Sequence, residues 1–69
     1  MKYLVIYEKT ATGYSAYVPD LPGCITTGAT LQDTEFLMKE AIEFHIEGLR
    51  EDALPIPTPT TTADYITAA

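Results

Sequence analysis

Few side chains in this sequence could carry out chemistry, and His45 is the most capable of them. It is the only histidine of the chain, and histidine exchanges a proton most readily near neutral pH. Asp20 or Glu40 could partner it if the fold brought them together, which would give a small hydrolase. The alternative is a packed histidine with one ring nitrogen hydrogen-bonded. The sequence favours this alternative, because the nearby glutamates lie elsewhere around the predicted helix.

The other reactive groups give no better case for catalysis. Cys24 follows a turn instead of opening a helix, so no helix dipole activates it, and as the only cysteine it forms no Cys-x-x-Cys motif. A zinc site built from one histidine and one cysteine is not expected. The acids Glu8, Asp20, Glu40 and Glu43 could suggest a two-metal nuclease, but the interior of the first predicted strand, residues 2–7, contains no acid to converge with them. We expect no catalytic residue, no metal and no cofactor.

Length and charge restrict the possible partners. A chain of 69 residues makes one small domain (1–69) that buries only about 60% of its unfolded surface. Since one cysteine excludes an internal disulfide, we expect support from a homo-oligomer or from another protein. The net charge of −6 disfavours direct nucleic-acid binding and suits either a basic protein partner or simply solubility. Without a signal peptide or a membrane-length apolar run, we expect a cytoplasmic protein with no membrane contact.

The chain is organised around a stiff corner at residues 19–23. Its prolines fix their own φ angles, and Gly23 supplies the permissive backbone that closes the turn. The corner separates strands predicted at 14–18 and 24–28, and we expect it to set the register of the second one and to aim the following helix. The residues of this structural signature are Pro19, Asp20, Leu21, Pro22, Gly23, Cys24, Gly28 and Thr30.

Another strand is predicted at residues 2–8, and a hairpin loop containing Gly13 joins it to the strand at 14–18. Alternation along the strands puts Leu4 and Ile6 on one side of the sheet. The opposite side is expected to carry three tyrosines, Tyr3, Tyr7 and Tyr17. One helix covers one face only, so this aromatic face is either a candidate interface or a partly exposed, wet surface.

A helix is predicted from Thr30 to about Arg50, with Thr30 as N-cap. Its main apolar stripe consists of Leu31, Thr34, Met38, Ala41, Ile42, His45 and Leu49. Leu37 and Phe44 lie about 100° away from the centre of that stripe. They are either covered by a thick domain or exposed as an apolar patch for another chain. Both alternatives stay open.

The C-terminal part changes character after the helix. Residues 53–61 form a Pro-rich, extended and semi-rigid connector. Strand propensity returns at 63–67, where Tyr65 and Ile66 stand. We expect a fourth strand there, with a frayed tail as the alternative.

Several motifs together resemble the HicB-like antitoxin family over residues 1–57. They are Gly13-Tyr14, Val18-Pro-Asp-Leu-Pro-Gly-Cys24, Thr27-Gly-x-Thr-Leu31, Lys39-Glu-Ala-Ile42 and Leu54-Pro-Ile-Pro57. The resemblance implies an α+β, β-β-β-α-β partial RNase H-like fold, one helix packed on a small, mostly antiparallel sheet, whose last strand lies beside the first. It implies no nuclease activity, and it implies as partner a HicA-like toxin, a small basic protein that cleaves mRNA.

Two departures from the family pattern leave an alternative. The sequence stops at Ala69, where many members continue into a DNA-binding module, and the helix start at 34–38 differs from the common Ala-rich pattern. We therefore expect no operator binding by this chain. A stand-alone homo-oligomeric binding module without a toxin partner remains the second hypothesis.

Overall fold

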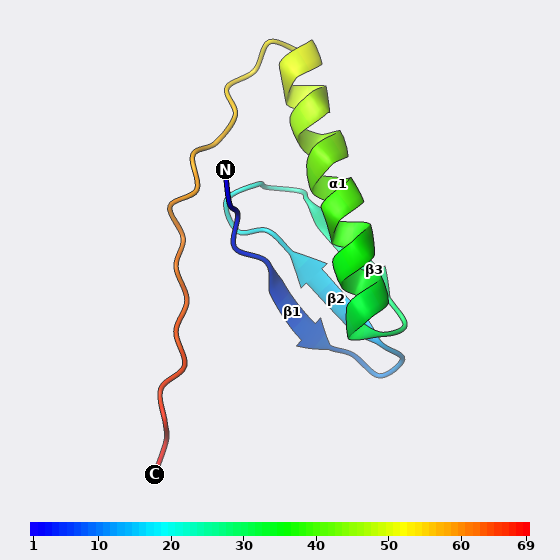
Figure 1. Cartoon of the computed structure of the whole chain (residues 1–69), viewed down its shortest axis with the longest axis vertical. Coiled ribbons are helices and arrows are strands. Elements are labelled where there is room, and N and C mark those ends of the chain that lie inside the picture. The colour runs from blue at the N-terminus through cyan, green and yellow to red at the C-terminus, as the bar shows by residue number, and fades with distance from the viewer.

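The computed structural model describes residues 1–69 and has an α+β architecture. Strands β1 (Ile6–Lys9), β2 (Tyr14–Tyr17) and β3 (Ile25–Gly28) precede a single helix, α1 (Leu31–Glu51). The strands form an antiparallel sheet in the order β1-β2-β3, and α1 crosses one face of it (Figure 1). This confirms the predicted three-stranded antiparallel sheet followed by one helix. No helix is both long and apolar enough to cross a membrane.

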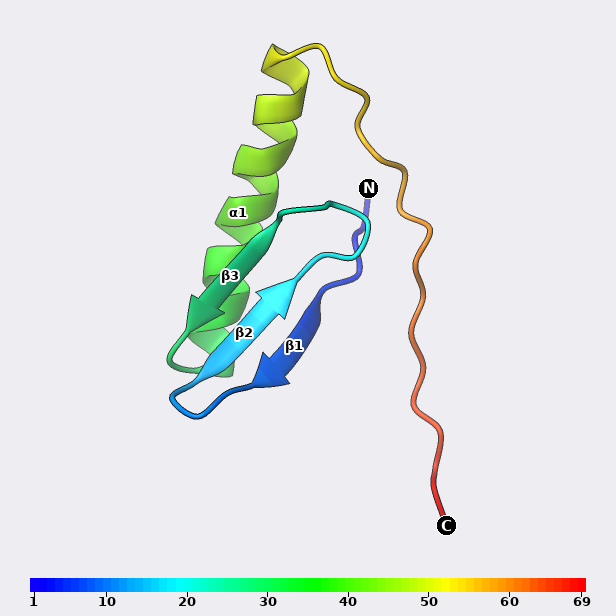
Figure 2. The same ribbon diagram turned by 180° about the vertical axis from the view of Figure 1, so that it is seen from behind.

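The strand register decides which side chains face the helix. Tyr7 lies opposite Ala16 and Ile6 lies opposite Tyr17, and opposed residues share a face of the sheet. Ala16 is fully buried in the core, against which Tyr3 and Tyr7 also pack. Tyr17 therefore projects with Ile6 from the opposite face, which carries no second layer in Figure 2.

The prediction that Tyr3, Tyr7 and Tyr17 share one face is therefore wrong. Each strand alternates as expected, but the faces of two strands are matched only by their pairing, and a slip of one residue inverts the match. The hairpin turn sets that pairing here: Thr10 donates its N–H to the carbonyl of Gly13. Two of the tyrosines belong to the interior and the third to the open face.

The core is small and lies between the corner and the first half of α1. Its fully buried apolar residues are Ala16, Val18, Leu21, Cys24 and Met38. The N-cap prediction is confirmed, because the Thr30 hydroxyl accepts the N–H of Asp33 at 3.0 Å. Thr34, the only buried polar residue, satisfies its hydroxyl by donating to the Thr30 carbonyl at 2.7 Å.

Two glycines allow the helix start to approach the sheet closely. A Cβ on Gly28 would stand 2.6 Å from the Thr34 hydroxyl and 2.9 Å from the Thr34 backbone nitrogen. A Cβ on Gly13 would stand 2.2 Å from the carbonyl oxygen of Gly28. Hairpin loop, strand end and helix therefore stack with no room for a side chain between their backbones.

The helix ends in a tight turn around Ala53. The N–H groups of Ala53 and Leu54 bond back to the carbonyls of Arg50 and Leu49, which is the Schellman pattern of helix termination. Ala53 takes a φ of 54° in the left-handed region that glycine usually occupies at this position. The turn reverses the chain, which then runs back along the β1 side of the sheet (Figures 1 and 2).

The fourth strand expected at 63–67 is not formed. Residues 54–69 contain no helix or strand, and β1 keeps a free edge. The Pro-rich connector is extended as predicted, but it carries the chain past β1 instead of pairing with it. Strand propensity alone was insufficient, because a strand exists only where a neighbouring backbone accepts its hydrogen bonds.

Candidate functional site

Asp20 of the corner holds the C-terminal segment in place. Its carboxylate accepts the backbone N–H groups of Thr60 and Thr61, each at 3.0 Å, and their hydroxyls at 3.2 and 2.7 Å. These bonds, above all those from Thr61, hold the pKa of Asp20 below its ordinary value. A second contact is the hydrogen bond from the Tyr3 hydroxyl to the carbonyl of Pro57. The corner thus anchors a segment 40 residues away.

This contact could not be predicted from the sequence, because Asp20 and the two threonines are far apart in the chain. The corner was expected to act as a scaffold for β3 and α1. It does flank the start of β3, and the N–H of Cys24 bonds to the carbonyl of Leu21 across it. In the structure the corner also binds the C-terminal segment, through the carboxylate of Asp20. The prolines and the glycine of the corner have no side-chain acceptor for these hydrogen bonds.

The residues considered for catalysis are not assembled into a site. Both carboxylate oxygens of Asp20 are occupied by threonines, and His45 is half-buried on α1. Cys24 is buried, its thiol directed to the Met38 sulfur at 3.9 Å, and burial raises the pKa of this thiol. No cluster of three or more His, Cys, Asp or Glu side chains could hold a metal ion.

Tyr3 and Tyr7 are half-buried beneath the helix, so they offer little surface to a partner. Burial, and to a lesser degree the Glu35 carboxylate, raise the pKa of Tyr7. Tyr17 is exposed on the open sheet face, where the 66% exposed Ile25 lies opposite it on the neighbouring strand. Ile25 is absent from the predicted interface residues, although alternation along its strand could have indicated it.

Leu37 and Phe44 are the most informative of the predicted interface residues. Leu37 is 40% exposed and Phe44 is 80% exposed, so the domain does not cover them. Phe36, which lies further round the helix, is 64% exposed. We call Phe36, Leu37 and Phe44 the helix seam. It is an apolar surface on α1, and its Phe36 and Leu37 lie near the end of β3 at Gly28.

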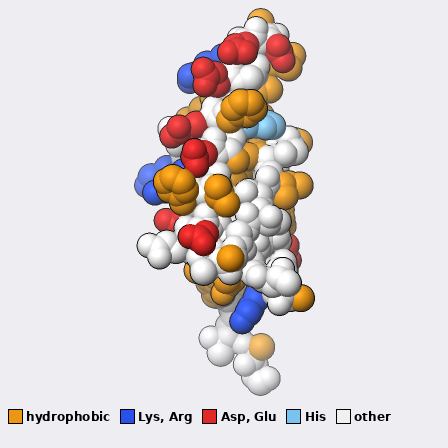
Figure 3. Space-filling view, turned by 90° about the vertical axis from the view of Figure 1, so that its right-hand side faces the viewer, with side chains coloured by type: hydrophobic (Ala, Val, Ile, Leu, Met, Phe, Trp, Pro, Cys, Tyr) orange, Lys and Arg blue, Asp and Glu red, His pale blue; other side chains and the backbone are white.

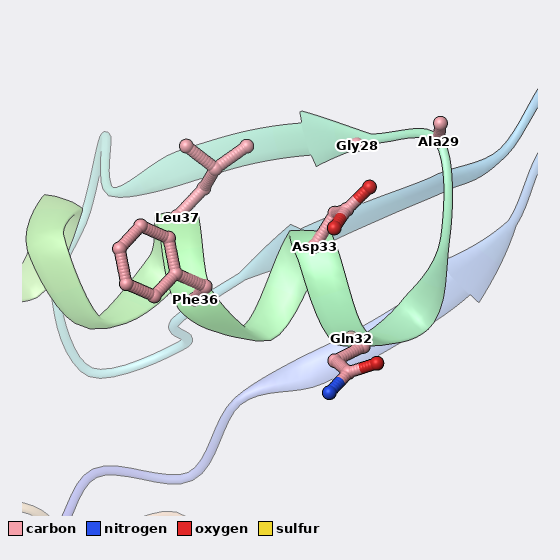
Figure 4. A pocket seen from close by; sticks show the side chains of 6 residues that line it. All are labelled: Gly28, Ala29, Gln32, Asp33, Phe36 and Leu37. Atoms are coloured by element: carbon pink, nitrogen blue, oxygen red, sulfur yellow. The ribbon is translucent and has the colours of Figure 1, made fainter.

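A hollow lies at each end of the helix seam. The first, of about 470 Å³, is lined by Gly28, Ala29, Gln32, Asp33, Phe36 and Leu37. Figure 4 shows Leu37 and Asp33 directed toward the side on which Gly28 and Ala29 lie, whereas Gln32 points away. The second, of about 210 Å³, is lined by Phe44, Glu47, Gly48 and Glu51. Each hollow thus combines aromatic surface with a carboxylate.

Acidic residues follow the helix seam along its whole length. Asp33, Glu40, Glu47 and Glu51 are all exposed, and at 100° per residue they fall within about 60° of one another beside Leu37 and Phe44. The two basic residues of the helix, Lys39 and Arg50, lie further round it. Figure 3, which views the molecule from the helix side, shows acidic side chains next to apolar ones over α1. The seam therefore offers apolar contact within a negative field.

The sequence and the fold both match one protein family. Residues 3–69 match the model of the HicB_like antitoxin of bacterial toxin-antitoxin system. A chain in the solved HicA3 and HicB3 toxin-antitoxin complex has the same fold, with a TM-score of 0.75 and 35% identity, over 87% of this chain and 70% of that one. The UPF0150 protein of Thermoplasma acidophilum is 45% identical over 83% of this chain and 84% of its own length.

Two longer relatives match almost the whole chain. Antitoxin HicB 2 of Photorhabdus laumondii is 31% identical over 93% of this chain and 46% of its own length. A 14.9 kDa protein from the rep-hol intergenic region of Haemophilus phage HP1 is 44% identical over 96% of this chain and 50% of its own length. The chain thus spans about half the length of these relatives.

Proposed function

This chain belongs to the HicB-like antitoxin family of bacterial toxin–antitoxin systems, and we propose that it is a non-catalytic antitoxin that binds and neutralises a small basic HicA-type toxin. The relative in the solved complex assembles with a HicA toxin, which supports a partner of this kind. The proposal places the protein in the cytoplasm, where such a toxin would meet mRNA. It assigns the inhibition to coverage of the toxin surface.

The observation that carries this proposal is the exposed helix seam with its border of acids. Leu37 and Phe44 stay in water in the single chain, although large apolar side chains gain free energy by burial. Aromatic anchors that fill pockets dominate the energetics of protein interfaces. Phe44 is the side chain of this chain best suited to be such an anchor.

Charge supplies the second part of the argument. The acids beside the seam favour a partner that presents lysines and arginines around an apolar centre, and opposite charges accelerate association. A basic RNA-cleaving protein has this character, because it must attract phosphates. The same negative charge argues against direct nucleic-acid binding by residues 1–69.

The test is co-expression with the product of a short basic reading frame beside this gene, followed by capture and calorimetry. We expect a complex and relief of growth arrest. Phe44→Ser should weaken the complex by at least about tenfold with little loss of folding stability. Ile25→Ser, at a 66% exposed apolar position on the open sheet face, is the matched control and should bind normally.

The outcomes separate the protein's role from the surface it uses. Absence of a complex and of growth rescue with the unaltered chain would refute the antitoxin proposal. If Ile25→Ser lost the toxin and Phe44→Ser kept it, the binding surface would be the open sheet face.

A self-associating module without a toxin is the second candidate function. It is favoured by Tyr17 and Ile25, which are exposed opposite each other on the open sheet face. It predicts an oligomer in the absence of any partner and no binding of the neighbouring gene product. The capture experiment distinguishes the two candidates, because only the antitoxin binds the neighbouring gene product.

A further inference from the structure

We propose that residues 63–67 add as a strand to the free edge of β1 in a second copy of this chain, and that two copies exchange these segments. This self-association uses neither the helix seam nor a toxin. It therefore stands or falls independently of the antitoxin role.

The segment at residues 63–67 is unpaired in the single chain. Tyr65 is 100% exposed and Ile66 is 88% exposed, the most exposed aromatic and aliphatic side chains of the molecule. Both residue types favour strands. Their only local support is the hydrogen bond of the Tyr65 N–H to the Asp64 carboxylate. A strand-forming segment is thus held out without a strand to pair with.

Hydrogen bonds attach the chain just before this segment to the rest of the domain. The bonds of Thr60 and Thr61 to Asp20 fix the chain immediately before residue 63. The hydrogen bond from Tyr3 to Pro57 fixes it further back. The segment is therefore presented in a defined direction from a rigid base, which lowers the entropy cost of docking.

The segment lies on the same side of the sheet as an unpaired strand edge (Figures 1 and 2). β1 has a free edge, which offers unpaired backbone groups to an added strand. The segment lies on the β1 side and runs in roughly the same direction as β1 in both views (Figures 1 and 2). In a dimer whose two copies are related by a twofold axis perpendicular to the strands, this direction is reversed. The exchanged segment then meets the partner's β1 antiparallel. Antiparallel pairing is the more stable kind.

Charge permits this contact although each copy carries a net charge of −6. The charged side chains at and beside β1 are Lys2, Glu8 and Lys9, which gives this edge one surplus positive charge. The only charged residue of the segment is Asp64. The junction thus brings one carboxylate to an edge with one surplus positive charge, whereas the acid-bordered helix seam would repel a second seam.

The first experiment measures mass in solution by light scattering after size-exclusion chromatography. The unaltered chain should be a dimer without any toxin. The double variant Tyr65→Ser with Ile66→Ser should dimerise at least about tenfold more weakly. Both side chains are exposed in the single chain, so the variant keeps its fold, which circular dichroism verifies. Leu54→Ser, at an exposed apolar position outside the segment, should remain dimeric.

Amide hydrogen exchange locates the contact. We expect the outward amides of β1 to be protected in the unaltered chain and to lose this protection in the double variant, while β3 is unchanged. A monomeric unaltered chain would overturn the proposal. Protection of β1 that persists in a monomer would mean pairing within one chain, and a change at β3 would mean another edge. Either result also refutes the exchange.

Discussion

The two halves of α1 are one continuous helix but differ in what they contact. The first half holds Thr34 and Met38, which are fully buried against the sheet. The second half has no fully buried residue, and its Phe44 is 80% exposed. The backbone is the same, so the difference comes from the sheet, whose short strands end beneath the first half of the helix (Figure 1).

This contrast separates the residues that stabilise a very small domain from those that we propose bind a partner. The first half of α1, the corner and the glycine contacts form the core. In the second half Ile42 and Ile46 still pack against the core, whereas Phe44 and the acids beside it form a surface that the core does not use. Substitutions should therefore change stability in the first region and association in the second.

The sharpest test of this contrast compares two large apolar residues of the helix. Met38→Ala should lower the free energy of unfolding by about 3 kcal/mol, because it leaves a cavity in a core of few residues. Phe44→Ala should change it by less than about 0.5 kcal/mol, since the ring is exposed. Chemical denaturation of both variants measures the difference. Equal losses would mean that the second half of α1 is part of the folding core.

A smaller effect with opposite signs is expected from the same substitution at two glycines. Gly28→Ala should destabilise the fold by about 2 kcal/mol, because the new Cβ collides with the Thr34 backbone. Gly48→Ala should stabilise it by about 0.5–1 kcal/mol, since alanine is the better helix former and nothing lies within 4 Å of the added Cβ. Thermal unfolding of both variants tests the pair. A destabilised Gly48→Ala protein would show that other residues pack against the helix at Gly48.

The smallest effect concerns the attachment of the C-terminal segment to the corner. The pKa of Asp20 is lowered in the folded protein, so its bonds to Thr60 and Thr61 contribute fully above the ordinary pKa of aspartate, near 3.8. That contribution is lost as the pH falls through the lowered value. We expect the amides of Thr60 and Thr61 to lose hydrogen-exchange protection in acid while the core stays folded. Asp20→Asn should lack this acid-dependent change, and an identical pH profile in that variant would contradict the role of the carboxylate.

Much of the fold could be predicted because it depends on local rules. The N-cap at Thr30, the helix ending near Arg50 and the strands on either side of the corner follow from residue type and spacing. The separation of Leu37 and Phe44 from the main stripe was also visible, because helical periodicity fixes angles around the axis. Family membership rests on the same motifs.

The rest depended on contacts between distant residues. Sequence alternation could not show that Tyr17 faces away from Tyr7, because the pairing of two strands decides this. Nor could it show that Asp20 binds Thr60 and Thr61, or that residues 63–67 pass β1 without pairing.

The sequence by itself determined the elements, the negative charge and the presence of a surplus apolar seam, because these are properties of residue order along one strand or helix. The tertiary structure decided which side of the sheet is covered, which side chains remain exposed and what the corner's carboxylate holds. These outcomes depend on register and on hydrogen bonds across the chain, which exist only once separate elements meet.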